Sequence, residues 1–212
     1  MRYSVIPVTL LQQNCTLVWC EETRKGVVID PGGEVPRILK EIARREVQVE
    51  RVLITHGHLD HAGGAAALAR HLQAPIEGPH EADRFLLDLL PWQGQMLGLE
   101  GESFLPERWL AEGDSIVFGK ASLEVRHCPG HTPGHVVYAN AKAGFAQVGD
   151  VLFAGSIGRT DLPGGDTAAL TRSIKEKLWP LGDGTVFVPG HGPASTIGKE
   201  RLSNPFVADR RG

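Results

Sequence analysis

Hydrophobic positions near the start of the chain fall in short runs, and later ones recur at helical spacing. Three runs closed by polar residues, glycine or proline predict strands at 3–8, 14–20 and 25–30. Apolar residues then recur every three to four positions between 34 and 45, which predicts a helix. Beyond the buried strand RVLI (51–54), the alanine-rich stretch 63–72 predicts a second helix. Strands come first and then alternate with helices.

The second half of the chain repeats this order. Residues 115–119 and 122–130 are expected to pair as a hairpin around Gly119–Lys120, and two more strands follow. A helix at 167–178 precedes a final strand in TVFVPGHG (185–192), and a short helix closes the chain. Two sheets with helices packed outside them satisfy this order. We therefore predict an α+β fold, a four-layer αββα sandwich, in a single domain over residues 1–212.

Composition narrows the classes of partner. Hydrophobic residues make up 42% and charged residues 22% of the chain, which suits a normal buried core. A net charge of −3 gives no electrostatic reason to expect nucleic acid or an acidic membrane. The three scattered cysteines are typical of reduced small hydrophobes, and no apolar run approaches the roughly 20 residues of a membrane span. The N-terminus also lacks a signal-peptide pattern. A cytoplasmic globular protein is expected, as a monomer or a small homo-oligomer.

Residues able to bind metal are concentrated where strands end. The strand RVLI runs directly into THGHLDH (55–61), and three later strands each end in a histidine or an aspartate. Loops that follow such strands tend to gather at one edge of a sheet. Imidazole suits zinc, iron and related ions, and a carboxylate can bridge two of them. The candidate ligands are His56, His58, Asp60, His61, His131, Asp150 and His191.

The spacing within THGHLDH predicts which of its side chains face the same metal position. In an extended loop His56 and His58 point the same way, so both can reach one ion. Asp60 and His61 follow as the chain turns into a helix, and they face a neighbouring position. A lone histidine at a strand end is more often a surface or capping residue, so the hypothesis depends on the whole set. Two divalent ions about 3.5–4 Å apart could hold a hydroxide and polarise a carbonyl together. Zinc is favoured, and iron or manganese would also suit these ligands.

Four motifs carry a resemblance to a known family. THGHLDH, CPGHTPGH (128–135), GDVLFAG (149–155) and VPGHG (188–192) together resemble the metallo-β-lactamase superfamily, and within it the glyoxalase II branch of hydroxyacylglutathione hydrolases. The resemblance covers nearly the whole chain. It implies the metallo-hydrolase fold, with the metal site at one edge of the two sheets. The β-lactamases proper usually have a cysteine where Asp150 stands, which argues against antibiotic hydrolysis.

The resemblance also assigns the ligands to two ions. One ion would be held by His56, His58 and His131, and the other by Asp60, His61 and His191. Asp150 would bridge them. Typical glyoxalase II enzymes continue into a C-terminal helical extension that contributes to the glutathione site, and this chain ends soon after Pro193. It is similar instead to the short single-domain bacterial members.

The expected reaction is hydrolysis of a thioester such as S-D-lactoylglutathione to D-lactate and glutathione by a metal-bridging hydroxide. Asp60 and Asp150 would be catalytic, since they would orient the hydroxide as well as bind metal. The small-molecule substrate would be glutathione-derived. The alternative comes from Gly158–Asp161 (GRTD), which resembles the persulfide dioxygenases, a sister branch that uses one iron and would act on glutathione persulfide. A metal-stabilised binding domain is a third class, but a closed structural zinc site is usually rich in cysteine.

Four further residues could act around the metals. Asp30 and Thr55 could each orient a ligand histidine through a hydrogen bond. Alternatively, Asp30 could be only a turn residue and Thr55 only the end of a strand. His135, four residues after His131, is expected to be structural or to support a ligand. Arg159 could clamp a substrate carboxylate, or could be an ordinary surface arginine.

Residues 80–90 are expected to be helical, with their leucines on one side. The overlapping stretch 85–99, FLLDLLPWQGQMLGL, is apolar although it is broken by proline and glycine. It could form a lid over the substrate with Trp92 and Met96 as walls, part of the core, or a dimer surface.

Overall fold

Two β-sheets lie face to face in the computed structural model, which describes residues 1–209. The first sheet holds, in spatial order, β1 (Arg2–Val8), β2 (Gln13–Trp19), β3 (Lys25–Ile29), β4 (Gln48–Leu53) and β5 (Ile76–Glu77). The second holds β13 (Ser195–Thr196), β12 (Val186–Pro189), β9 (Phe145–Gly149), β8 (Val136–Asn140), β7 (Ala121–His127) and β6 (Ser115–Phe118). A small hairpin joins β10 (Leu152–Phe153) to β11 (Ser156–Ile157).

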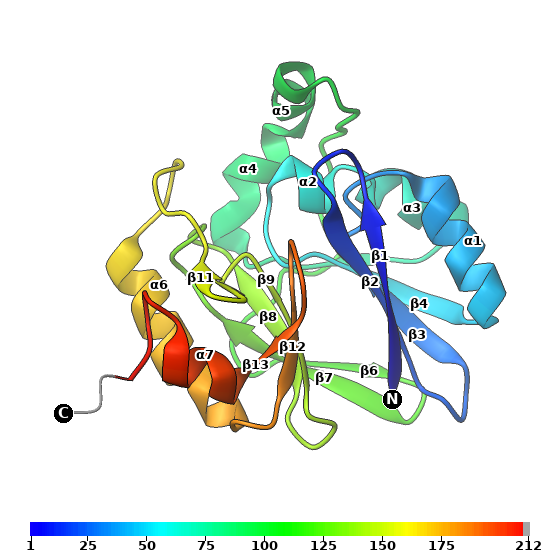
Figure 1. The fold of residues 1–212 in the computed structure, drawn as a ribbon. Helices are drawn as coiled ribbons and strands as arrows, with labels where there is room; N and C mark the ends of the chain where they lie inside the picture. Colours follow the sequence, from blue (N-terminus) through cyan, green and yellow to red (C-terminus); the bar gives the residue numbers. More distant parts are fainter. Residues whose placement is uncertain (210–212) are drawn as a thin grey trace.

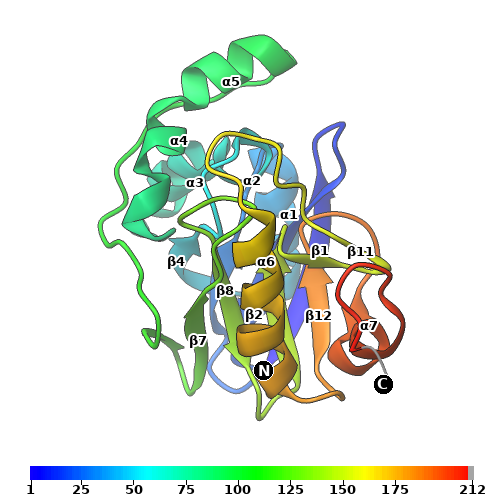
Figure 2. The ribbon, with the colours of Figure 1, turned by 90° about the vertical axis from the view of Figure 1, so that its left-hand side faces the viewer.

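Helices cover the outer faces of both sheets. Figure 1 shows α1 (Val35–Arg45) and α3 (Ala65–Leu72) outside the first sheet, and α6 (Thr167–Ser173) and α7 (Ile197–Ser203) outside the second. The short helix α2 (Leu59–Ala62) lies at the upper edge of the sheets in that view. Beside it, α4 (Arg84–Asp88) lies against the body, and α5 (Leu90–Leu97) extends away from it, as Figure 2 shows most clearly.

Alternation along each strand sends neighbouring residues to opposite faces and so builds three apolar layers. In β2, Leu17 packs with α1 and α3 residues, while Val18 packs against the other sheet. In β8, Tyr138 belongs to the layer between the sheets, while Val137 packs with α6. Three apolar layers separate four layers of structure, which confirms the predicted αββα sandwich.

Two parallel strand pairs place the loops that matter for the site. β3 pairs with β4 in parallel, with Ile29 opposite Leu53, and β9 pairs with β12 in parallel, with Gly149 opposite Pro189. Parallel neighbours end at the same edge of a sheet. The residues after β3, β4, β9 and β12 therefore leave their sheets at a common edge.

The structure differs from the predicted elements at several places. Residues 80–90 form a 3-10 turn (Glu81–Asp83), helix α4 and the start of α5 instead of one helix. Pro91 lies in the first turn of α5, where its missing N–H costs no helical hydrogen bond. The helix expected at 63–72 begins at Ala65, and α2 precedes it. The helix expected at 167–178 becomes a π-helical turn from Ile174. The hairpin β10–β11 and strand β13 had no signal in the pattern.

The apolar stretch 85–99 divides into a buried and an exposed part. Leu86, Leu87 and Leu90 are buried and belong to the core. Trp92 and Met96 on α5 are 57% and 68% exposed, so these two side chains are not part of the core. Whether α5 acts as a lid or as a dimer surface stays a prediction.

Within residues 1–209, no helix is both long and apolar enough to cross a membrane. Cys15, Cys20 and Cys128 are buried, and no two of them form a disulfide within the same residues. Their burial agrees with the expected role of small hydrophobic residues.

Candidate metal centre

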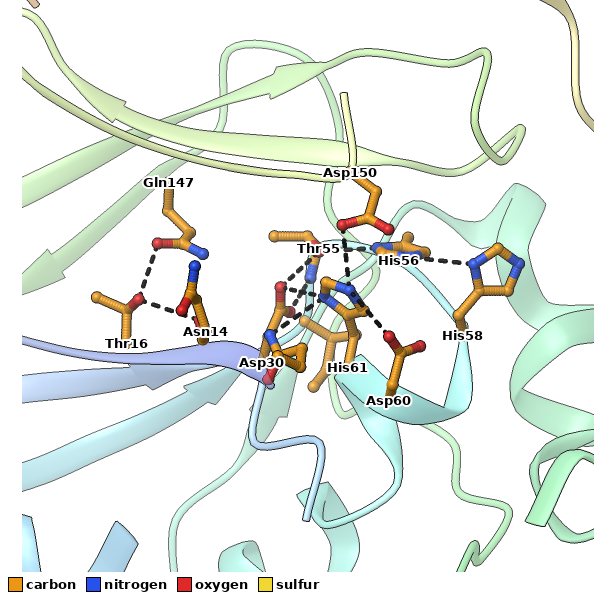
Figure 3. A network of polar contacts seen from close by, with 12 residues as sticks. Asn14, Thr16, Asp30, Thr55, His56, His58, Asp60, His61, Gln147 and Asp150 are labelled. Carbon is orange, nitrogen blue, oxygen red and sulfur yellow. Dashed lines mark hydrogen bonds and ion pairs between the residues drawn. The ribbon is translucent and has the colours of Figure 1, made fainter. Parts of the chain in front are cut away.

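All seven predicted ligand residues come together at the common edge of the two sheets. His56, His58, Asp60 and His61 come from the segment after β4, His131 from the segment after β7, Asp150 from the end of β9 and His191 from the end of β12. Figure 3 shows Asp150 reaching from the second sheet toward His61 and Asp60 of the first. The site is therefore shared between the sheets.

The first group consists of three histidine nitrogens that face one point. His56 Nε2 lies 3.1 Å from His58 Nδ1, and His131 Nε2 lies 3.0 Å from the same atom. The extended segment between His56 and His58 does bring both rings to one place, as the spacing predicts. These three residues could hold one ion.

The second group lies beside the first and contains Asp60, His61 and His191. His191 Nε2 is 3.0 Å from Asp60 Oδ2, and His61 Nε2 is 3.7 Å from the same oxygen. Asp150 lies between the groups, with Oδ1 3.3 Å from His61 Nε2 and Oδ2 3.6 Å from His131 Nε2. One carboxylate thus faces both groups, which is the geometry of a bridging ligand.

In four histidines, the ring nitrogen that points away from the cluster lies within hydrogen-bonding distance of an oxygen. The Nδ1 atom of His56 donates to Thr55 Oγ1 (3.0 Å), and that of His61 donates to Asp30 Oδ2 (2.9 Å). The Nδ1 atom of His131 donates to the Arg159 carbonyl (2.8 Å), and that of His191 donates to the Leu11 carbonyl (3.1 Å). In a neutral imidazole, a nitrogen that donates on one side leaves the other without a proton and free to bind a cation. In their neutral form these four rings therefore present bare Nε2 atoms to both groups.

Asp30 and Thr55 lie where a supporting role requires. Asp30 is fully buried and accepts hydrogen bonds from the Thr55 backbone N–H (2.7 Å) and the Thr55 hydroxyl (2.7 Å) as well as from His61. Because the Thr55 hydroxyl donates to Asp30, its oxygen is free to accept from His56. Asp30 has a φ of 53°, in the left-handed region that aspartate tolerates better than most residues. The turn after β3 thus aims the carboxylate at the histidines.

His135 and Arg159 are placed differently from each other. His135 is fully buried, stacks on His56 at 4.6 Å between ring centroids, and its Nε2 accepts the Asp150 backbone N–H at 3.1 Å. The Arg159 guanidinium is exposed and forms an ion pair with Asp161, with Nη2 2.7 Å from Oδ2. Arg159 thus contacts the site through its carbonyl, and a clamp on substrate would require its guanidinium to leave Asp161.

The electrostatics of the site favour a positive charge. Burial lowers the pKa of His61, but the Asp150, Asp60 and Asp30 carboxylates outweigh it and raise that pKa well above its usual value. Burial raises the pKa of Asp150, but His61 and two further histidines outweigh it and hold that pKa well below its usual value. Three carboxylates around one buried histidine make a place for a cation.

Two buried atoms test whether a metal fits. His61 Nε2 and Asp150 Oδ1 face each other at 3.3 Å, and within residues 1–209 neither atom makes a hydrogen bond of good geometry. Leaving a buried polar atom without a partner costs about 1–3 kcal/mol, and both atoms point into the cluster. Histidine and aspartate donors without cysteine suit divalent zinc, iron or manganese. The residues present therefore fit divalent metal ions.

Glycine at two positions is what allows the chain to close around the site. A Cβ on Gly190 would lie 2.0 Å from Asp150 Oδ1 and 2.6 Å from His61 Cε1. A Cβ on Gly32 would lie 1.5 Å from the Asp60 carbonyl oxygen. The backbone packs directly against the ligands at both places.

Sequence reasoning missed the groups that hold the ligands through the backbone. The Leu11 and Arg159 carbonyls orient His191 and His131, and the carboxylate of Asp83 contacts the loops of His58 and His131. None of these follows from local spacing, because each depends on segments far apart in the sequence.

The chain is similar in sequence and in fold to several known proteins. The chain is 45% identical over 209 residues to the protein named hydroxyacylglutathione hydrolase GloC from Haemophilus influenzae, and the match covers 98% of each chain. It is also similar to BLEG-1, a protein named a B3 metallo-beta-lactamase, with 34% identity, a TM-score of 0.89 and coverage of 98% of this chain and 100% of that one.

Two further solved structures have the same fold. TTHA1623, described in a di-iron-bound form, has 38% identity and a TM-score of 0.86 over 96% of this chain and 99% of its own. ETHE1 from Myxococcus xanthus has 26% identity and a TM-score of 0.83 over 98% of this chain and 85% of its own.

The expected resemblance is confirmed by a match over most of the length. The profile of the metallo-beta-lactamase superfamily matches residues 8–191, a range that begins at the end of β1 and runs to the last candidate ligand. The chain therefore belongs to the metallo-β-lactamase superfamily.

Proposed function

We propose that the protein is a metal-dependent hydrolase of the glyoxalase II type, acting on a glutathione thioester such as S-D-lactoylglutathione to give D-lactate and glutathione. The observation that carries the proposal is the position of Asp150, whose two oxygens face two separate groups of ligands. The likeness to hydroxyacylglutathione hydrolase GloC over 98% of both chains supports the choice of substrate class.

In this proposal the two groups hold two divalent ions. His56, His58 and His131 would bind one, Asp60, His61 and His191 the other, and Asp150 both. Bound ions would supply an activated water at neutral pH and polarise the thioester carbonyl. Zinc is the favoured metal, and the di-iron form of TTHA1623 supports iron as a further choice.

The chain's own residues have separate tasks. Asp60 and Asp150 keep 17% and 13% of their side chains exposed, so water that enters the site can reach both carboxylates and be oriented by a hydrogen bond to them. His56 and His61 are fully buried and close the inner side of the site against bulk water. The thiolate leaves without a strong general acid, which fits the absence of another obvious acid in the sequence motifs.

The test is the loss of thioester absorbance of S-D-lactoylglutathione with protein of known metal content. Asp60→Asn and Asp150→Asn should each lower kcat about 100-fold or more, because they remove a metal ligand worth several kcal/mol. Asp183→Asn makes the same chemical change at an exposed ion pair with Arg201 and should keep the activity. Protein that binds two ions and shows no turnover would reject the glutathione thioester.

A second candidate function has one specific feature in its favour. Gly158–Asp161 is similar to the corresponding stretch of the persulfide dioxygenases, and the likeness to ETHE1 adds weight. Protein that binds a single iron and consumes oxygen with glutathione persulfide would establish this alternative. The likeness to BLEG-1 makes a β-lactam the third substrate to assay, and the aspartate at position 150 argues against it.

A further inference from the structure

Asp83 is a buried carboxylate outside the predicted ligand set. It ends the 3-10 turn Glu81–Asp83, between β5 and α4, and none of its surface is exposed. Burial raises the pKa of Asp83 to about 6, although hydrogen bonds to the carboxylate oppose that rise. A buried carboxylate is costly unless its oxygens accept well-placed hydrogen bonds. The groups that donate hydrogen bonds to Asp83 therefore indicate its role.

Its two oxygens accept hydrogen bonds from two different loops. Oδ2 accepts from the Gly57 backbone N–H at 3.0 Å and from the Thr132 hydroxyl at 2.7 Å. Oδ1 accepts from the Gly134 backbone N–H at 2.5 Å. The His80 N–H also donates to the Gly134 carbonyl at 3.0 Å, so three hydrogen bonds join the turn and the residue before it to the second loop.

These two loops carry the whole three-histidine group. Gly57 stands between His56 and His58, and Thr132 follows His131 directly. We propose that Asp83 is a positioning residue that fixes the separation of these two loops and thereby the geometry of the His56, His58 and His131 nitrogens. The inference deepens the proposed function and rests on it, since it assumes that this group holds a metal ion.

The backbone of both loops packs closely against the turn and the helix that follows it. A Cβ on Gly134 would lie 2.7 Å from Asp83 Cγ and 2.5 Å from the Asp83 backbone nitrogen. A Cβ on Gly57 would lie 2.6 Å from the Cβ of Leu86, in the helix that follows the turn. Both loops therefore rest directly on the turn, and a shift of the Asp83 side chain is transmitted to both.

The second group of ligands is held by other means. Asp60 and His61 stand on α2, His61 is bonded to Asp30, and the Asp60 carbonyl packs on Gly32. His191 is bonded to the Leu11 carbonyl. Removal of the Asp83 carboxylate should consequently weaken metal binding at the three-histidine group and spare the other group.

The first measurement is amide hydrogen exchange in the metal-free protein. In Asp83→Ala, the Gly57 and Gly134 amides should exchange about 10-fold faster or more than in the wild type, since each loses its acceptor. The Thr55 amide, which donates to Asp30, is the internal reference and should not change. Unchanged exchange at both glycines would overturn the proposal, whatever metal the protein binds.

The second measurement is titration with Co²⁺ followed by its visible spectrum. The step assigned to the three-histidine group should weaken about 10–100-fold in Asp83→Asn, the usual effect of removing a group that orients ligands. Thr132→Val removes one donor and should weaken the same step less, whereas Thr132→Ser keeps the hydroxyl and should restore it. This pair keeps the proposal testable should the Asp83 variants fail to fold.

Glu200→Gln is the matched control. Glu200 is a buried carboxylate that also accepts three hydrogen bonds, from Ser195, Gly155 and Asn204, but it touches neither loop. Its variant should lose stability and keep both titration steps. Equal weakening of both steps in Asp83→Asn would overturn the proposal. A wild type that binds no Co²⁺ would instead reject the proposed function, and with it the role of Asp83 toward a metal.

Discussion

At the scale of single residues, the site depends on which nitrogen of each histidine carries the proton. His131 and His191 are fixed by backbone carbonyls, and His56 and His61 by the Thr55–Asp30 pair. A carbonyl accepts but never donates, so the Nδ1 facing it must carry hydrogen. In a neutral ring the Nε2 on the other side is then bare. This arrangement lowers the cost of binding a cation, because no ring has to change tautomer.

Gly190→Ala tests how closely the chain packs behind the ligands. The added methyl would lie 2.0 Å from Asp150 Oδ1, so either the carboxylate or the β12 loop must move. We expect metal binding to weaken by at least about 10-fold, the scale of disturbing a ligand's orientation. Isothermal titration with Zn²⁺ measures it. Gly184→Ala is the control, because a Cβ there has open space. Wild-type affinity in Gly190→Ala would contradict the close packing.

The ligands could be predicted from the sequence because their spacing is local and repeated. His56, His58, Asp60 and His61 lie within six positions, and each later ligand follows a recognisable strand. Asp83 could not be predicted in this way, because its role depends on contact with loops 26 and 51 residues away. The same reason hid the Leu11 carbonyl, which is 180 residues from His191.

At the scale of elements, the pattern predicts strands well and the ends of helices poorly. Each β-strand of five or more residues was expected, since alternation or an apolar run marks it. The two-residue strands β10 and β13 were not expected, because neither carries a recognisable pattern. The segment 80–90 has apolar residues at helical spacing, yet the contacts of Asp83 with two loops hold its start in a tighter turn. Tertiary contacts decide the form of such segments.

The contact between α1 and β1 provides a prediction about pH. Glu41 on α1 accepts hydrogen bonds from Arg44 (2.7 Å), Ser4 of β1 (2.6 Å) and Arg45 (2.8 Å). The hydrogen bond from Arg44 is the largest cause that lowers the pKa of Glu41 to about 2 from its ordinary 4.5. A lowered pKa contributes stability above pH 4.5 that is lost as the pH falls toward about 2.

Glu41→Gln should therefore lower the free energy of unfolding at pH 7 by about 1 kcal/mol, since both arginines are partly in solvent. The difference from the wild type should shrink below pH 4.5. Urea unfolding of both proteins at pH 7, 4.5 and 3, in the presence of a chelator, measures it. Glu21→Gln, at a more exposed pair with Arg2, is the control and should change less. A difference that stays constant with pH would assign the effect to packing instead of charge.

At the scale of the whole molecule, the metal centre connects the two sheets. The apolar layer between them joins Val18, Val27 and Leu53 of the first sheet to Val125 and Tyr138 of the second. At the edge of that layer the ligands of both sheets meet around Asp150. We propose on this basis that residues 1–212 act as one domain, so that calorimetry shows a single unfolding transition. Two separate transitions would contradict it.

Removal of metal should destabilise the molecule as a whole. The ligands come from both sheets, and without bound cations the negative charges of their carboxylates are no longer balanced. A ligand present at 100 times its Kd stabilises the folded state by about 2.7 kcal/mol per site. For a chain of this size, that corresponds to a Tm lower by roughly 5–10 °C for each site emptied.

Calorimetry of the zinc-loaded protein before and after a chelator measures the shift, and added zinc should reverse it. His191→Ala removes a ligand of the second group only, so its chelator-induced shift should be about half that of the wild type if each site contributes equally. A wild-type Tm that the chelator leaves unchanged would show that the bound ions do not stabilise the fold. The same shift in His191→Ala as in the wild type would show that only the three-histidine group holds a stabilising ion. That second outcome would favour the single-iron alternative over the hydrolase, because it leaves Asp60, His61 and His191 without a metal to bind.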